Sequence, residues 1–141
     1  YFSRKDYNNF AKEMRVIVSQ YPSKLTAYDF AASQLINVKE YDLAFNFLIK
    51  RYKENPDAFT AKWLGNISLN KGLLDDAIQY LNESVKFDNS DAQVYYNLAG
   101  AFIQKEEFDN ALKSIGKCIK INPEFPNART LKVQLTEITG Q

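Results

Sequence analysis

The chain repeats one pattern every 33 or 34 residues, and this period limits its fold more than any other feature. Each copy has an aromatic residue or Leu, an acidic residue, an Ala, an apolar residue four positions later, and a closing Pro or Asn. The copies span residues 40–57, 73–90 and 107–124, with Ala44, Ala77 and Ala111 in equivalent places and Pro56, Asn89 and Pro123 at the ends. A fourth copy, residues 6–23, ends at Pro22. A fixed period of this length indicates a repeat architecture.

A second helical segment precedes each of the three full copies. These segments span residues 25–37, 58–70 and 92–104. Small and large apolar side chains recur in them at i, i+3, i+4 and i+7, which is the period of a helix with one buried face. Each unit is therefore predicted to be two antiparallel helices joined by a short turn. No single pair could bury its apolar side chains alone, so the pairs are expected to stack.

This pattern resembles the tetratricopeptide repeat, in which Leu-Gly, Tyr, Ala, an aromatic residue and Pro recur at fixed places. The matching residues are Leu64, Gly65, Ala77 and Leu81 in one unit and Tyr95, Leu98, Ala99, Phe102, Phe108, Ala111 and Pro123 in the next. The resemblance implies an all-α fold, a right-handed superhelical solenoid of antiparallel helix pairs. It divides one domain, 1–141, into a truncated repeat (1–24), full repeats (25–57, 58–91 and 92–125) and a capping helix (126–141).

Gly65 is predicted to be a packing notch. Gly inside a helix costs about 1 kcal/mol relative to Ala, so its presence there needs a reason. Ala32 and Ala99 occupy the equivalent places in the neighbouring units. A small residue there lets the first helix of a pair approach the second closely. Arg51, where the family usually has a small residue, is a departure from the pattern.

Composition excludes several classes of function. The 18 Lys and Arg residues nearly balance the 17 Asp and Glu residues, which argues against a nucleic-acid partner. No apolar run approaches 20 residues, so no membrane span is expected. The chain has no His and one Cys, which removes the commonest general base and metal ligand. We therefore expect neither catalysis nor a metal or other cofactor. Cys118, at a small-residue site, is expected to be buried and unreactive.

The resemblance also implies a binding site, because the first helices of this family line a groove that usually holds a partner's peptide or helix. Carried over position by position, the groove residues are Asp29, Ser33, Asn37, Phe59, Lys62, Trp63, Asn66, Asn70, Gln93, Tyr96, Asn97 and Gln104. Asn and Gln offer a donor and an acceptor together, which suits the backbone of an extended peptide. The alternative is structural: Trp63 would pack partly within its own unit, and Asn97 would hold the fold.

A narrower hypothesis concerns a carboxylate ligand. Lys62, Asn66 and Asn97 match part of the carboxylate clamp by which some members of the family hold the C-terminus of a chaperone. The places for two further basic residues hold Asn127 and Leu131 instead. The clamp is therefore predicted to be incomplete, with one cation in place of three.

The leading hypothesis is a non-catalytic protein–protein interaction module that binds a peptide or protein segment in this groove. We expect it to be part of a larger protein, because Tyr1 aligns with the end of a first helix. The alternative is a structural or assembly segment that packs on another domain of its own chain, or forms a homo-oligomer through the truncated repeat. In a further variant, a catalytic domain lies outside this sequence.

Overall fold

The computed structural model describes residues 9–10, 12–13, 16 and 25–141. Seven helices have defined bounds in this part of the chain: α2 (Leu25–Asn37), α3 (Tyr41–Glu54), α4 (Ala58–Asn70), α5 (Leu74–Phe87), α6 (Ala92–Gln104), α7 (Phe108–Ile121) and α8 (Ala128–Thr139). The described residues contain no strand, and the predicted all-α class is confirmed. The predicted truncated repeat, residues 1–24, lies almost wholly outside the described residues.

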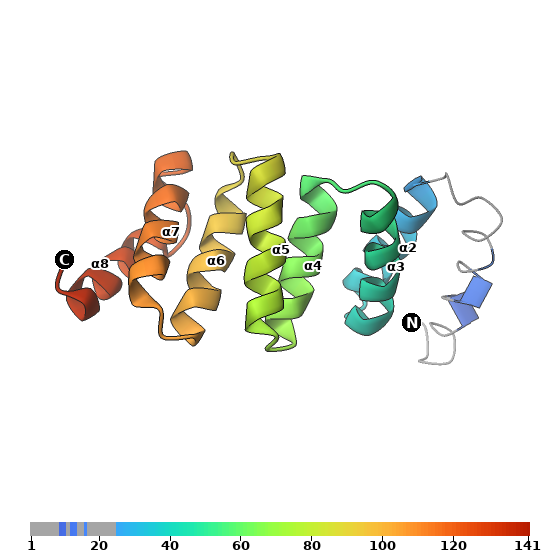
Figure 1. The fold of residues 1–141 in the computed structure, drawn as a ribbon, viewed down its shortest axis with the longest axis horizontal. Helices are drawn as coiled ribbons and strands as arrows, with labels where there is room; N and C mark the ends of the chain where they lie inside the picture. The colour runs from blue at the N-terminus through green and yellow to red at the C-terminus, as the bar shows by residue number, and fades with distance from the viewer. Residues whose placement is uncertain (1–8, 11, 14–15, 17–24) are drawn as a thin grey trace. The chain divides into compact units, whose positions relative to one another are not determined.

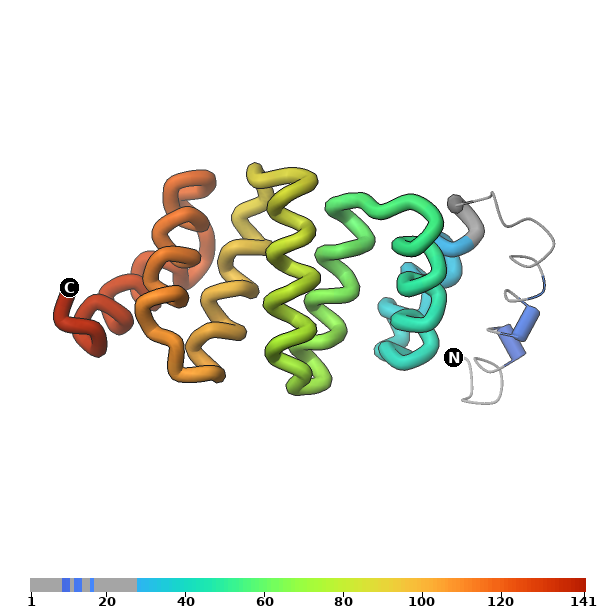
Figure 2. The backbone as a smooth tube through the Cα atoms, in the orientation of Figure 1, coloured from blue at the N-terminus to red at the C-terminus, as the bar shows by residue number. Residues whose placement is uncertain are grey.

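The structure forms two compact units, residues 1–56 and 57–141. In the first, α2 packs on α3. In the second, α4 packs on α5 and α6 on α7, while α5 contacts α6 and α7 contacts α8. Figure 1 shows α4 to α7 side by side, from green to orange. The turns that join these helices lie at alternate ends in Figure 2, so neighbouring helices run antiparallel as predicted.

The turn inside each helix pair has the same backbone geometry. One residue in each turn is left-handed, and these are Lys39, Gly72 and Glu106, with φ of 62°, 75° and 59°. The next backbone N–H donates to a carbonyl five residues earlier: Glu40 to Leu35, Leu73 to Ser68 and Glu107 to Phe102, at 2.8–2.9 Å. This pattern satisfies carbonyls left open at a helix end. The sequence repeat is therefore also a repeat of backbone conformation.

Gly65 is a packing notch, as predicted. A Cβ atom built on Gly65 would lie 2.6 Å from Cγ and 2.8 Å from Cδ2 of Leu81, and 3.2 Å from the Leu81 backbone N. Leu81 is fully buried on α5, the partner helix of α4. The two helices can cross at this distance only because residue 65 has no side chain.

One hydrophobic cluster in the second unit joins residues of successive helix pairs. Its buried members come from α5, α6, α7 and α8 and are Leu81, Ala92, Val94, Tyr95, Leu98, Ala99, Ala111, Ile115, Cys118, Ala128 and Leu135. Phe102 and Ile119 pack against this cluster while partly exposed. Because side chains from successive pairs share one cluster, each pair depends on its neighbour for burial.

Arg51 is accommodated by an ion pair rather than by space. It is 6% exposed on α3, and its Nε donates to Oδ1 of Asp29 on α2 at 3.0 Å. A guanidinium N–H also donates to the backbone O of Asn55. A buried charge is tolerated when it is paired and hydrogen-bonded in this way. Arg51 therefore links the two helices of the first unit through polar contacts.

Among the residues that the structure describes, no helix combines the length and apolar character needed to cross a bilayer.

Replacing Gly65 by Ala is expected to destabilise the second unit by about 1–3 kcal/mol, the usual range for overpacking a core. Gly100→Ala is the matched control, because Gly100 is inside α6 but nothing lies within 4 Å of a Cβ atom built on it. It should stabilise by up to about 1 kcal/mol through helix propensity. Urea unfolding followed by circular dichroism measures both. Equal effects of the two substitutions would contradict the notch.

Cys118 is expected to resist thiol reagents in the folded protein. It is fully buried on α7, and burial raises the pKa of its thiol, so the neutral form persists to a higher pH than in an exposed Cys. The reactive thiolate is therefore scarce at pH 8. Ellman's reagent should react on the order of 100-fold more slowly than in 8 M urea, because reaction requires local opening. Equal rates in the two conditions would place Cys118 at the surface.

Candidate functional site

The first helices of the second unit, α4 and α6, begin at Asp residues. Oδ1 of Asp57 accepts from the backbone N–H of Thr60 at 2.8 Å, and Oδ1 of Asp91 accepts from that of Gln93 at 3.0 Å. Such caps satisfy N–H groups that a helix start leaves open. They fix where each helix begins. The polar residues Lys62, Asn66 and Asn70 then follow at spacings of four on one side of α4.

Three predicted groove residues form a chain of hydrogen bonds between α4 and α6. Nε2 of Gln93 donates to Oδ1 of Asn97 at 2.8 Å. Nδ2 of Asn97 donates in turn to Oδ1 of Asn66 at 2.7 Å. Asn66 and Asn97 are 31 positions apart in the chain, and stacking of the helix pairs brings them together. Asn97 thus links the two helices by a side-chain hydrogen bond, and its part in ligand binding stays a prediction.

An open depression of about 480 Å³ adjoins this chain. It is lined by Asn66, Leu69, Asn70, Asn97 and Gln104. Asn66 and Asn97 are half-buried, whereas Asn70 and Gln104 are exposed. We call the side chains of Asn66, Asn70, Gln93, Asn97 and Gln104 the amide face. The amide face carries no formal charge and offers hydrogen-bond donors and acceptors to solvent.

Lys62, the cation of the predicted clamp, is already paired. Its Nζ lies 2.7 Å from Oδ2 of Asp91, the residue that caps α6. The Lys62 and Asp91 side chains are 25% and 33% exposed. A smaller hollow of about 270 Å³ at this pair is lined by Ala58, Phe59, Lys62, Ser84, Asp88 and Asp91. Hydrogen bonds from Ser90 lower the pKa of Asp88, so this carboxylate is negatively charged at neutral pH.

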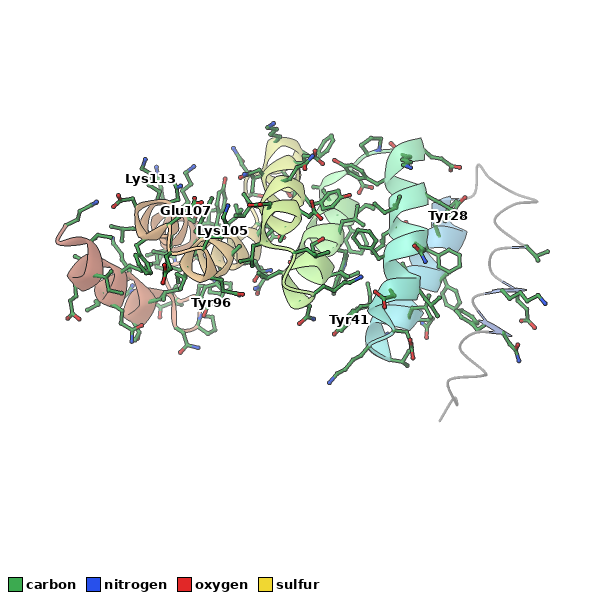
Figure 3. The ribbon with its side chains drawn as sticks, turned by 60° about the horizontal axis from the view of Figure 1, so that its bottom comes forward. Tyr28, Tyr41, Tyr96, Lys105, Glu107 and Lys113 are labelled. Atoms are coloured by element: carbon green, nitrogen blue, oxygen red, sulfur yellow. The ribbon has the colours of Figure 1, made fainter. Side chains whose placement is uncertain are left out.

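The aromatic groove residues form two separate pairs. Phe59 and Trp63, one turn apart on α4, meet edge to face with ring centroids 6.4 Å apart. Phe59 is 50% exposed, and Trp63 is half-buried. Tyr96 of α6 lies against Phe125, with centroids 5.0 Å apart. Figure 3 shows Tyr96 at the lower edge of the second unit and Lys113 of α7 at the upper edge, so they lie on different faces.

The remaining predicted groove residues lie on α2, in the first unit. Asp29 accepts the hydrogen bond from Arg51, Ser33 is half-buried and Asn37 is exposed at the end of the helix. The helix α2 belongs to a different compact unit from α4 and α6. A groove shared by these residues with α4 and α6 stays a prediction.

A second depression of about 480 Å³ lies between the α6–α7 turn and the end of α8. Its lining residues are Glu106, Glu107, Phe108, Asp109, Asn110, Ile138 and Thr139. Two of its carboxylates already have partners: Asn110 and Lys105 bind Glu107, and Gln141 binds Asp109. Two hydrogen bonds lower the pKa of Glu107, and the one from Asn110 has a larger effect than the one from Lys105. Two hydrogen bonds raise the pKa of Lys105, and the one to Asp75 has a larger effect than the one to Glu107. These contacts tie the turn to α5.

Sequence reasoning missed three residues of the site. Asp91 is recognisable in the sequence as a helix cap, but its pairing with Lys62 across 29 positions is not. Leu69 forms part of the depression, and Phe125 covers one side of Tyr96. Both are apolar residues next to polar ones at helix or loop edges. No sequence signal separates them from ordinary core residues.

Comparison with known proteins supports the repeat assignment. A family model described as tetratricopeptide repeat matches residues 63–91 and 92–125. An Hsp70-Hsp90 organising protein of Plasmodium falciparum is 36% identical over 70 residues, which are 50% of this chain and 28% of that protein. The Hsp70-Hsp90 organizing protein of Triticum aestivum is 25% identical over 149 residues, covering 86% of this chain and 26% of its own length. The chain thus spans little more than a quarter of these relatives.

Solved structures show the same fold at low sequence identity. MamA superposes with a TM-score of 0.86 at 18% identity, covering 99% of this chain and 86% of its own. YrrB, described as a TPR protein with an unusual peptide-binding site, gives 0.77 at 16% identity over 96% and 77% of the two chains. The first TPR of Spaghetti (RPAP3), bound to an HSP90 peptide, gives 0.77 at 13% identity over 84% and 95%.

The solenoid class predicted from the repeat is confirmed by these likenesses together with the helix pairs. The family model, the curated relatives and the repeated helix pairs agree: residues 63–125 of the chain are tetratricopeptide repeats.

Proposed function

We propose that the chain is a non-catalytic interaction module whose amide face binds an extended segment of a partner polypeptide. The observation that carries this proposal is the chain of hydrogen bonds from Gln93 through Asn97 to Asn66 beside an open depression. It holds amide groups in fixed positions on an accessible surface. A peptide that binds there meets groups whose orientation is already set, which lowers the entropic cost of binding.

The chemistry of the amide face complements a peptide backbone. Each Asn or Gln side chain offers one carbonyl and one NH₂ group, the same pair of functions that every peptide unit presents. In the described part of the chain, no hydrogen bond engages the Asn66 NH₂ group or the side chains of Asn70 and Gln104. These groups are available for backbone carbonyls and N–H groups of a ligand.

Apolar anchors flank the polar groups. Leu69 lines the depression, and the exposed ring of Phe59 lies against Trp63. Aromatic residues commonly contribute a large share of binding energy at interfaces. We infer that one apolar or aromatic side chain of the ligand contacts these apolar residues of α4. The backbone of the ligand contacts the amide face.

The relatives support a polypeptide ligand. Two of them are named for Hsp70 and Hsp90, and one structural neighbour holds the HSP90 peptide SRMEEVD. Another neighbour is the TPR2B-domain:pHsp70 complex of yeast Sti1. The alternative, self-association through the truncated repeat, rests on residues outside the described part and stays a prediction.

Binding is expected to depend on Asn66 and Asn97. An array of seven-residue peptides, acetylated and amidated at their ends, should show a subset that the chain captures. Replacing both residues by Ala should weaken capture of that subset by about tenfold, since each change removes a hydrogen bond worth about 0.5–1.5 kcal/mol. Fluorescence anisotropy with the captured peptides measures the affinities.

Asn82→Ala is the matched control, because Asn82 is an exposed amide on α5, outside the amide face. It should leave the affinities unchanged, and circular dichroism should show that every variant folds. If no peptide is captured, or if the double variant captures peptides as well as the unaltered chain, the amide face is not the binding site.

A further inference from the structure

The charge of the binding surface depends on one ion pair. The groove residues on α4 and α6 are Phe59, Lys62, Trp63, Asn66, Asn70, Gln93, Tyr96, Asn97 and Gln104, and Lys62 alone among them is charged. Its ammonium group lies 2.7 Å from the Asp91 carboxylate. The single cation of this surface is therefore neutralised by a residue of the same unit.

Asp91 uses its two oxygens for two different purposes. Oδ1 accepts from the backbone N–H of Gln93 and caps α6, while Oδ2 accepts from Lys62. The cap holds the start of the helix that carries Gln93 and Asn97. The same side chain therefore positions part of the amide face and cancels the charge beside it.

We propose that Asp91 sets the ligand preference of this surface: by neutralising Lys62 it makes the amide face select an uncharged stretch of polypeptide over an anionic one. This inference rests on the proposed function, and it names the chemical class of the ligand. A peptide carboxylate would have to displace Asp91 from Lys62 in order to gain an ion pair of its own. The exchange of one carboxylate for another yields little free energy.

The surroundings of the pair disfavour an anion further. Asp88, a second carboxylate, lines the hollow at Lys62 and would repel a negative ligand. At the two places where the family resemblance would put further basic residues, the chain has Asn127 and Leu131. Neither residue supplies a compensating cation. An uncharged backbone avoids these costs, because it needs only the donors and acceptors of the amide face.

Asp91→Asn separates the two roles of the residue. The Asn side chain retains an oxygen that caps a helix as well as Asp does, so α6 should keep its start. The negative charge that Asp91 places beside Lys62 is lost. Asp76→Asn makes the same change of net charge at an exposed position in the first turn of α5, and it is the matched control.

The probes are two seven-residue peptides of nearly equal shape, both acetylated at the N-terminus and both carrying citrulline, the neutral analogue, in place of Arg. SRMEEVD with a free carboxylate is then the anionic probe, and SRMQQVN with a C-terminal amide is its uncharged counterpart. Titrations are followed by NMR, through the side-chain NH₂ signals of Asn66 and Asn97, which report binding at the amide face even when it is weak. The full chain is used at low ionic strength, where screening is smallest.

We expect the unaltered chain and Asp76→Asn to bind SRMQQVN amide at least as tightly as SRMEEVD. In Asp91→Asn, affinity for SRMEEVD should rise by about threefold to fivefold, the ratio that partly exposed ion pairs supply. Affinity for SRMQQVN amide should stay the same. The gain should disappear in 0.5 M salt.

Lys62→Met provides a second test that does not alter the cap. It leaves Asp91 without its partner, so SRMEEVD should bind more weakly while SRMQQVN amide is unaffected. The double variant Asp91→Asn with Lys62→Met should return to the preference of the unaltered chain, because both charges are gone.

The outcomes separate this inference from the proposed function. Binding of both probes with an unaltered ratio in Asp91→Asn and Lys62→Met overturns the role of Asp91 and leaves the amide face as a peptide site. A clear preference of the unaltered chain for SRMEEVD also overturns the role of Asp91, and it too leaves the amide face as a peptide site. Absence of any shift at Asn66 and Asn97 with either probe in every variant overturns the proposed function, and the inference with it.

Discussion

The close crossing of paired helices is the constraint on which the other features of the second unit depend. Gly65 lets α4 approach the buried Leu81 of α5, and Ala77, Ala99 and Ala111 are fully buried in the same layers. Helices that cross so closely leave no space for a larger side chain, and packing at this density transmits any change to neighbouring residues. The pair α4–α5 thereby forms a closely packed unit on which the next pair can stack.

Stacking of these pairs produces the binding surface. The first helices α4 and α6 belong to successive pairs, and their polar sides meet where Asn97 donates to Asn66. The contact is specific in register, because a shift of one residue on either helix would turn the amide away. The amide face is thus a product of the same packing that builds the core, and its geometry follows from that packing rather than from contacts among exposed loops.

Much of the fold could be predicted from the sequence. The segments 25–37, 58–70 and 92–104 coincide with α2, α4 and α6, and the notch at Gly65 is confirmed. These successes share a cause: helix period, turn residues and small residues at crossings are local signals repeated three times. The candidate site is less predictable. The sequence predicts that Asn66 and Asn97 lie in the groove, with a structural role as the alternative for Asn97, and in the structure the two side chains bond to each other. Lys62, the expected cation of the clamp, is paired.

The sequence by itself determined the period, the helix pairs, the uncharged character of most groove residues and the positions at which helices must approach closely. Only the tertiary structure decided which polar groups meet across the pairs. Lys62 and Asp91 are 29 positions apart, and nothing in either local sequence indicates that they form an ion pair. Helix periodicity fixes the side of a helix on which a residue lies, whereas the partner of that residue depends on how far one pair is rotated and shifted against the next.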